Sequence, residues 1–240
     1  DPHTFEAGAK VSQTVSSARL VVQNGLGYDS YMNKIEAATP SSARKVIVVQ
    51  HLLGLPDSTA NPHLWYDPGT VPKVARAVAD DLSRLAPAHA AVFSANLARF
   101  TASLQPWLEA IASARAAYAG TPVATTEPVA AYLIEAMGLD DLTPFVFQAD
   151  VMNGVDPSPQ DVTTEKALLT GNRVKAFVYN EQVTDSLTQS LATLSHGHDV
   201  PVVGVYETMP TPGYHYQTWM VAEVRSIVRA LADHVSTTHL

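Results

Sequence analysis

The sequence predicts an α/β protein with two lobes, each built around a parallel β-sheet, and three observations support this fold class. First, short apolar runs, such as residues 45–50, alternate with helical patterns in both halves of the chain, as expected when helices cover both faces of parallel sheets. Second, a long helical pattern at residues 87–118 separates the two halves. Third, hydrophobic residues make up 46% of the 240 residues, which is enough for a sizeable core.

The first lobe is assigned to residues 1–86. Two short apolar runs predict strands at residues 19–23 and 45–50, and the Asn-Gly-Leu-Gly sequence at residues 24–27 predicts a turn between them and the next helix. The predicted helices of this lobe cover residues 11–18, 28–36 and 70–85, the last with Pro72 in its first turn.

The link between the lobes is assigned to residues 87–118. Apolar residues recur there mostly at steps of three and four, which predicts one long helix with an apolar stripe. This stripe consists of Phe93, Leu97, Phe100, Leu104, Trp107, Leu108, Ile111, Ala114 and Tyr118. Because Pro106 lacks a backbone N–H, we expect a kink or a break near it.

The second lobe is assigned to residues 119–240, where strands and helices again alternate. Apolar runs predict strands at residues 122–126, 145–147, 175–179 and 200–205. Capping residues and apolar periodicity predict helices at residues 128–137, 158–169, 184–195 and 218–234.

Composition excludes several classes of partner and site. The formal net charge is −8, and no run of Lys and Arg occurs, so nucleic acid is not an expected partner. The chain has no cysteine, so any metal ion must be held by His, Asp or Glu. No apolar stretch approaches the roughly 18 residues that would span a bilayer.

Three side chains stand where a parallel sheet or a stiff loop would present metal ligands. His3 and His63 each follow a proline, which restrains the backbone and lowers the cost of ordering an imidazole. Glu127 lies between a predicted strand and a predicted helix, where ligands of open sheets bind. Each also has a simpler interpretation. His3 and His63 could be polar surface residues, and Glu127 could favour the start of a helix through its charge.

The sequence resembles the metal-type (zinc, manganese or iron) solute-binding proteins of ABC importers, the periplasmic metal-binding family of cluster A-I. The family's Asp-Pro-His-Xaa-aromatic-Glu motif matches residues 1–6, and its Asn-Pro-His-Xaa-Trp-Xaa-Asp-Pro motif matches residues 61–68. Further similar segments are residues 18–26, 126–139, 157–161 and 207–220.

This resemblance implies four metal ligands, two from each lobe, in the cleft between the lobes. His3 and His63 are the expected pair of the first lobe, and Glu127 is the expected third ligand. The family usually has an Asp in the fourth place; here Glu207 is the expected ligand, with Glu181 as the alternative.

The same resemblance implies a function in transport. We expect a monomeric extracytoplasmic protein, periplasmic or lipid-anchored at the cell surface, that captures Mn²⁺ or Zn²⁺ and delivers it to an ABC transporter permease without enzymatic activity. Two imidazoles with two carboxylates tilt the expected cargo slightly towards Mn²⁺. A long His-rich loop, frequent in the zinc-specific branch, has no counterpart in residues 51–60.

Family members normally have a strand, a helix and another strand before the first motif. This chain begins at the motif with Asp1, so we expect the sheet of the first lobe to be incomplete at its start. Two alternative functions stay open at this stage: a metal-dependent hydrolase that uses the same His and Glu residues, and a surface adhesin whose metal is structural.

Overall fold

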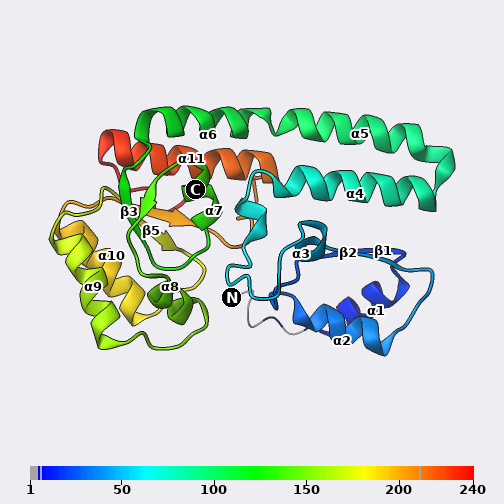
Figure 1. The fold of residues 1–240 in the computed structure, drawn as a ribbon, viewed down its shortest axis with the longest axis horizontal. Helices are drawn as coiled ribbons and strands as arrows, with labels where there is room; N and C mark the ends of the chain where they lie inside the picture. The colour runs from blue at the N-terminus through cyan, green and yellow to red at the C-terminus, as the bar shows by residue number, and fades with distance from the viewer. Residues whose placement is uncertain (1–4, 6, 211) are drawn as a thin grey trace. The chain divides into compact units, whose positions relative to one another are not determined.

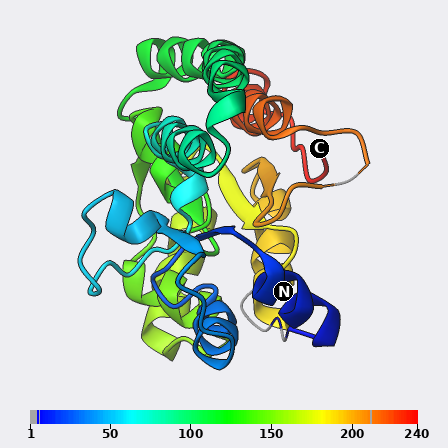
Figure 2. The same cartoon turned by 90° about the vertical axis from the view of Figure 1, so that its right-hand side faces the viewer.

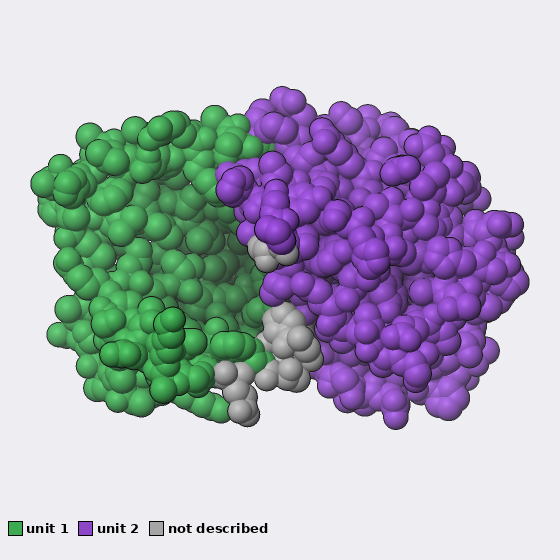
Figure 3. Space-filling model, turned by 180° about the vertical axis from the view of Figure 1, so that it is seen from behind, with its two compact units in different colours: residues 1–104 green, residues 105–240 purple. Residues whose placement is uncertain are grey.

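The computed structural model describes residues 5, 7–210 and 212–240. The chain forms two compact units, Asp1–Leu104 and Gln105–Leu240, which are coloured separately in Figure 3. The division falls inside the linking segment predicted at residues 87–118. Strands are parallel in both units, as the apolar runs predict.

Unit 1 contains two parallel strands, β1 (Leu20–Gln23) and β2 (Lys45–Val48). Helices α1 (Ala9–Ser17) and α2 (Ser30–Ala38) contribute to a small core formed by Val15, Val21, Met32 and Ile35. Strand β2 is two residues shorter than predicted, because the chain turns at Val49 into the short helix α3 (Val49–Leu52).

The rest of unit 1 consists of helices. The 3₁₀ turn η2 (Leu64–Tyr66) leads into α4 (Thr70–Leu85), and η3 (Pro87–His89) leads into α5 (Ala90–Ser103), which packs along α4. The Asp67 side chain accepts hydrogen bonds from the Gly69 amide and the Thr70 hydroxyl, at 3.0 and 2.8 Å. These bonds fix the start of α4, where backbone N–H groups lack partners within the helix.

The predicted break near Pro106 is present. Helix α5 ends at Ser103, and α6 (Gln105–Tyr118) begins after Leu104. Pro106 is thus the second residue of α6, a position where its missing N–H costs no helical hydrogen bond. The linking stretch therefore consists of η3 and two α-helices, with α5 in unit 1 and α6 in unit 2.

Unit 2 is built on a four-stranded parallel sheet in the order β4-β3-β5-β6. Its strands are β3 (Pro122–Thr125), β4 (Asp140–Asp141), β5 (Phe177–Asn180) and β6 (Val202–Val205). All residues of β5 and β6 are buried, as expected for a parallel sheet covered on both faces.

Helices cover both faces of this sheet. Figure 1 shows α8 (Phe145–Met152), α9 (Pro159–Thr170) and α10 (Ser186–Gly197) on one side. On the other side, α6 and α11 (Tyr216–Asp233) pack side by side, as Figures 1 and 2 both show, and α7 (Ala131–Ala136) packs against α6. The core under α8, α9 and α10 contains Phe147, Val151, Leu168, Leu169, Phe177, Leu191 and Val202, among others.

No helix in the described part of the chain is both long and apolar enough to cross a membrane.

One predicted strand is wrong. Residues 145–147 begin helix α8, and the strand that pairs with β3 is the two-residue β4. Phe147 and Val151 are buried four residues apart, whereas Phe145 and Val146 are 44% and 60% exposed. This pattern is that of one helical face, which a run of only three apolar residues cannot reveal.

The C-terminal segment after α11 runs parallel to β6. Thr237 pairs with Val203, accepts a hydrogen bond from the Gly204 amide at 2.8 Å and donates one to the Val202 carbonyl at 2.9 Å. The segment therefore covers the open edge of the sheet with backbone hydrogen bonds, as an added strand does.

Candidate metal centre

His63 is fully buried in unit 1 and is held by its neighbour Asn61. The Asn61 side-chain oxygen accepts a hydrogen bond from the His63 backbone amide at 3.0 Å and lies 2.7 Å from Nδ1 of the His63 ring. Since this oxygen is an acceptor, Nδ1 carries the proton and donates it. Nε2 is then the basic nitrogen, which can coordinate a metal ion.

The loop around His63 is tied to the turn after β1. The Asn24 side chain donates a hydrogen bond to the Pro62 carbonyl at 2.9 Å. Asp29 in turn accepts from the backbone amides of Asn24 and Gly25, at 2.5 and 3.0 Å. The Asn-Gly-Leu sequence that the resemblance singled out therefore supports the His63 loop from a distant part of the chain.

Two aromatic rings surround the His63 imidazole. The ring centroids of Trp65 and Tyr28 lie 5.3 and 6.1 Å from that of His63, both in edge-on arrangements. Together with the Asn61 hydrogen bond, these rings restrict the rotation of the imidazole. A restrained imidazole loses little freedom when it binds an ion.

In unit 2, the candidate carboxylates stand at one edge of the sheet. Glu127 follows the end of β3 by two residues, Glu181 follows β5 directly, and Glu207 follows the end of β6 by two residues. Because all these strands are parallel, their carboxyl ends lie at the same edge, where ligands of such sheets bind. Glu127 and Glu207 are only 3% and 2% exposed.

Asn180 links the ends of β3 and β5. Its side chain donates a hydrogen bond to Oε2 of Glu127 at 3.3 Å, and its backbone amide donates to the Thr126 hydroxyl at 3.1 Å. The amide thereby orients the Glu127 carboxylate. A hydrogen bond of this kind is common around metal-binding carboxylates.

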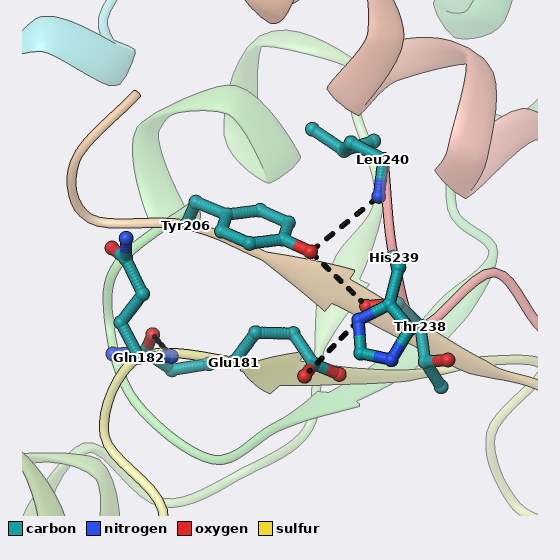
Figure 4. Close-up of polar contacts among 7 residues, drawn as sticks. Glu181, Gln182, Tyr206, Thr238, His239 and Leu240 are labelled. Carbon is teal, nitrogen blue, oxygen red and sulfur yellow. Dashed lines mark hydrogen bonds and ion pairs between the residues drawn. The ribbon is translucent and has the colours of Figure 1, made fainter. Parts of the chain in front are cut away.

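Glu181, the alternative fourth ligand, is directed towards the C-terminal segment. Oε2 of Glu181 lies 3.6 Å from Nδ1 of His239, and the nearby Tyr206 hydroxyl contacts the backbone of Thr238 and Leu240 (Figure 4). Burial raises the pKa of Glu181, and the His239 charge partly opposes this rise. This environment favours a role for Glu181 in holding the C-terminal segment.

His3 lies outside the described residues. Among the residues that the structure does describe, no three His, Asp or Glu side chains form a group that could hold a metal ion. The convergence of His3, His63, Glu127 and Glu207 on one ion therefore stays a prediction. Sequence reasoning missed the supporting roles of Asn61 and Asn180, although Asn61 belongs to the motif that drew attention to His63.

The comparison with protein families decides what kind of protein this is. Residues 1–230 match the family model described as zinc-uptake complex component A, periplasmic (ZnuA). The chain belongs to the ZnuA family. The description of this family names a periplasmic component of zinc uptake.

Two relatives of this ZnuA-family chain share parts of its sequence. The manganese-binding lipoprotein MntA of Halalkalibacterium halodurans is 29% identical over 107 residues, which is 44% of this chain and 36% of the relative. A putative metal-binding protein of Treponema pallidum is 24% identical over 176 residues, which is 66% of this chain and 54% of the relative. The matched part of this chain thus spans between about a third and a half of these relatives' lengths.

Solved structures share the fold of this chain. The solute-binding protein FpvC of Pseudomonas aeruginosa, solved with Mn²⁺, superposes with a TM-score of 0.77 at 19% identity, covering 97% of this chain and 86% of FpvC. The periplasmic zinc-binding protein TroA of Treponema pallidum gives a TM-score of 0.78 at 18% identity, covering 98% and 87%. At this level of identity the likeness establishes the α/β fold with parallel sheets.

Proposed function

We propose that this chain captures a divalent transition metal, Mn²⁺ or Zn²⁺, outside the cytoplasm and delivers it to an ABC-type importer. Its membership in a family of periplasmic components of zinc-uptake complexes supports this function. The relative in Halalkalibacterium halodurans is a manganese-binding lipoprotein, and FpvC was solved with Mn²⁺. The protein would act as a monomeric receptor, periplasmic or anchored by a lipid.

The observation that carries the proposal is the environment of His63. A fully buried imidazole donates its Nδ1 proton to Asn61 and keeps Nε2 basic. In metal-binding histidines the N–H of the second ring nitrogen usually donates to a carbonyl or carboxylate oxygen in this way, and this bond fixes both the tautomer and the ring orientation. This environment supports His63 as a metal ligand.

We propose His3, His63, Glu127 and Glu207 as the ligand set, with two ligands from each of the lobes assigned to residues 1–86 and 119–240. Two carboxylates make this set harder than an all-histidine site, which favours Mn²⁺ relative to such a site. Zn²⁺ still binds most nitrogen and oxygen sites more tightly than Mn²⁺. The concentration of each free ion around the protein therefore decides which ion occupies the site. Four protein ligands leave no position for a reactive water, which suits transport.

Metal titration of chelator-treated protein tests the proposal. Calorimetric titration with Mn²⁺, and competition with Zn²⁺, should give one site per chain. His63→Ala and Glu127→Ala should weaken binding by more than the about 10- to 100-fold that loss of an outer-shell partner costs. His196→Ala serves as the control, since His196 is exposed in the last turn of α10. Unchanged affinity in both ligand variants would refute the proposed site.

The two alternative functions predict different behaviour. A hydrolase would turn over ester or phosphoester substrates when metal is added, whereas a transport receptor should show no turnover. A structural metal would leave the protein unfolded after chelation, whereas a receptor must release its ion and stay folded. Circular dichroism of the chelated protein distinguishes the receptor from the adhesin.

A further inference from the structure

Unit 2 buries a polar cluster beside the end of β3, and the proposed ligand set does not include it. The cluster joins β3, β4, α8 and α9 through hydrogen bonds between side chains and backbone. Its members, called here the β3-end cluster, are Thr125, Asp141, Thr143, Gln148 and Glu165.

The β3-end cluster fixes Thr125 from two directions. The Thr125 amide donates to the Thr143 hydroxyl at 2.8 Å, and the Thr125 hydroxyl donates to Asp141 at 3.0 Å. Since β4 ends at Asp141, the Thr143 hydroxyl replaces the carbonyl that a longer strand would offer to this amide. Thr125 is the last residue of β3 and stands two residues before Glu127.

The hydroxyl of Thr143 is itself oriented by Glu165. Thr143 accepts the Thr125 bond and has one proton to donate, which goes to Oε1 of Glu165 at 3.2 Å. Asp141 fixes the Thr143 backbone by accepting its amide proton at 3.0 Å. Glu165 is 0% exposed, and its Oε2 has no hydrogen-bond partner among the residues that the structure describes.

The surroundings of Glu165 favour its neutral form. The pKa of Glu165 is raised to about 8, mainly by burial. The Thr143 hydrogen bond opposes this rise, and the charge of Asp141 adds to it. Asp141, on β4, is the charged group that acts on Glu165, and α8 contributes only the uncharged amide of Gln148 to this cluster. Near neutral pH the carboxyl therefore carries a proton and still accepts the Thr143 bond through its other oxygen.

We propose that Glu165 is a positioning residue for Glu127, the proposed metal ligand: Glu165 holds Thr143, and Thr143 holds the end of β3 from which Glu127 extends. The proposal rests on the proposed function, because it gives Glu165 a task only if Glu127 binds metal. Glu165 would thus orient Glu127 without itself contacting the metal ion.

The test compares Glu165→Gln with Glu165→Leu in the complete, chelator-treated chain titrated with MnCl₂. Gln keeps a neutral acceptor for Thr143, whereas Leu removes the acceptor but keeps an apolar core position. We expect Leu to lose about 10- to 100-fold in affinity, as for other groups that orient metal ligands. Gln should stay within about threefold of the parent, a difference below 1 kcal/mol. Glu109→Gln is the control for net charge, since Glu109 is exposed on α6.

Two further measurements separate positioning from general stability. Between about pH 7 and about pH 8.5 the affinities of the parent and of Glu165→Gln should change in parallel, because the acid, the carboxylate and the amide at position 165 all offer Thr143 an acceptor oxygen. In metal-free Glu165→Leu, hydrogen exchange of the Thr125 backbone amide should be faster than in the parent, while the Val178 amide in β5 stays protected. If Glu165→Leu does not fold, Thr143→Val removes the same link and should reproduce the loss.

Each outcome has a defined meaning. Glu165→Leu or Thr143→Val with parental affinity would overturn the inference, and so would equal losses in Glu165→Gln and Glu165→Leu. If Glu127→Ala loses binding while Glu165→Leu does not, only the positioning role fails. If Glu127→Ala binds like the parent, the proposed ligand set fails, and the positioning role fails with it.

Discussion

The side-chain oxygen of Asn61 lies 2.7 Å from Nδ1 of His63 and 3.0 Å from the backbone nitrogen of the same residue. One short side chain thus fixes both the backbone and the ring of the buried histidine. Proline in between restrains the backbone further. This arrangement turns three consecutive residues, Asn61 to His63, into a rigid holder for one imidazole.

Replacement of Asn61 by Ala should therefore weaken metal binding although His63, the proposed ligand, is kept. The Nδ1 proton of His63 would lose its acceptor, and the ring would lose its fixed tautomer. We expect affinity to fall by about 10- to 100-fold, the usual cost of losing such a partner. Calorimetric titration of Asn61→Ala and Asn61→Asp measures this, and Asp, which keeps an acceptor oxygen, should retain most of the affinity. Parental affinity in Asn61→Ala would contradict the role.

The identity of the fourth ligand can be decided by two matched substitutions. Glu207→Ala should lose metal affinity, because we expect Glu207 to coordinate the ion. Glu181→Ala should keep affinity but loosen the C-terminal segment, since Glu181 lies 3.6 Å from His239. Metal titration and limited proteolysis of both variants check the two effects. A reversal of the two affinities would identify Glu181 as the ligand instead.

Gly204→Ala should destabilise unit 2. A Cβ atom at Gly204 would collide with the Thr238 carbonyl oxygen and approach Glu181 Cγ at 2.8 Å. The C-terminal segment would have to shift, and such overpacking costs about 1–3 kcal/mol. Thermal unfolding measures the loss. Gly197→Ala is the control, because nothing lies within 4 Å of its Cβ position, and it should be neutral or slightly stabilising.

Glu165→Gln should stabilise the metal-free protein more at about pH 7.5 than at about pH 5. The pKa of Glu165 is raised by burial to about 8, so between its unfolded pKa and this value the folded state keeps a proton that the unfolded state has released. Stability of the parent then falls as pH rises, and Gln removes this dependence. The gain between the two pH values is at most about 3 kcal/mol. Equal gains at both pH values would show that Glu165 is ionised in the folded protein.

Local sequence identified much of the scaffold. The apolar runs located strands β1, β2, β3, β5 and β6 to within a few residues. Strands β5 and β6 are buried on both faces, as a continuous apolar run predicts, whereas Val22 in β1 and Val46 in β2 are 44% and 40% exposed. Pro106 located the break between α5 and α6. Strand β4 was missed and α8 was mistaken for a strand, since β4 consists of two acidic residues whose only strand feature is their pairing with β3.

For the candidate site, the sequence by itself determined which residues stand at strand ends and in proline-restrained loops: Glu127, Glu207 and His63. It also carried the motifs that identify the family, because a motif is a local pattern of side chains. Only the tertiary structure decided which partners orient them. Asn180 reaches Glu127 across 53 positions of sequence, and Glu165 reaches Thr143 across 22. Such contacts depend on how strands and helices stack, and the packing of distant segments leaves no periodic signal in the sequence.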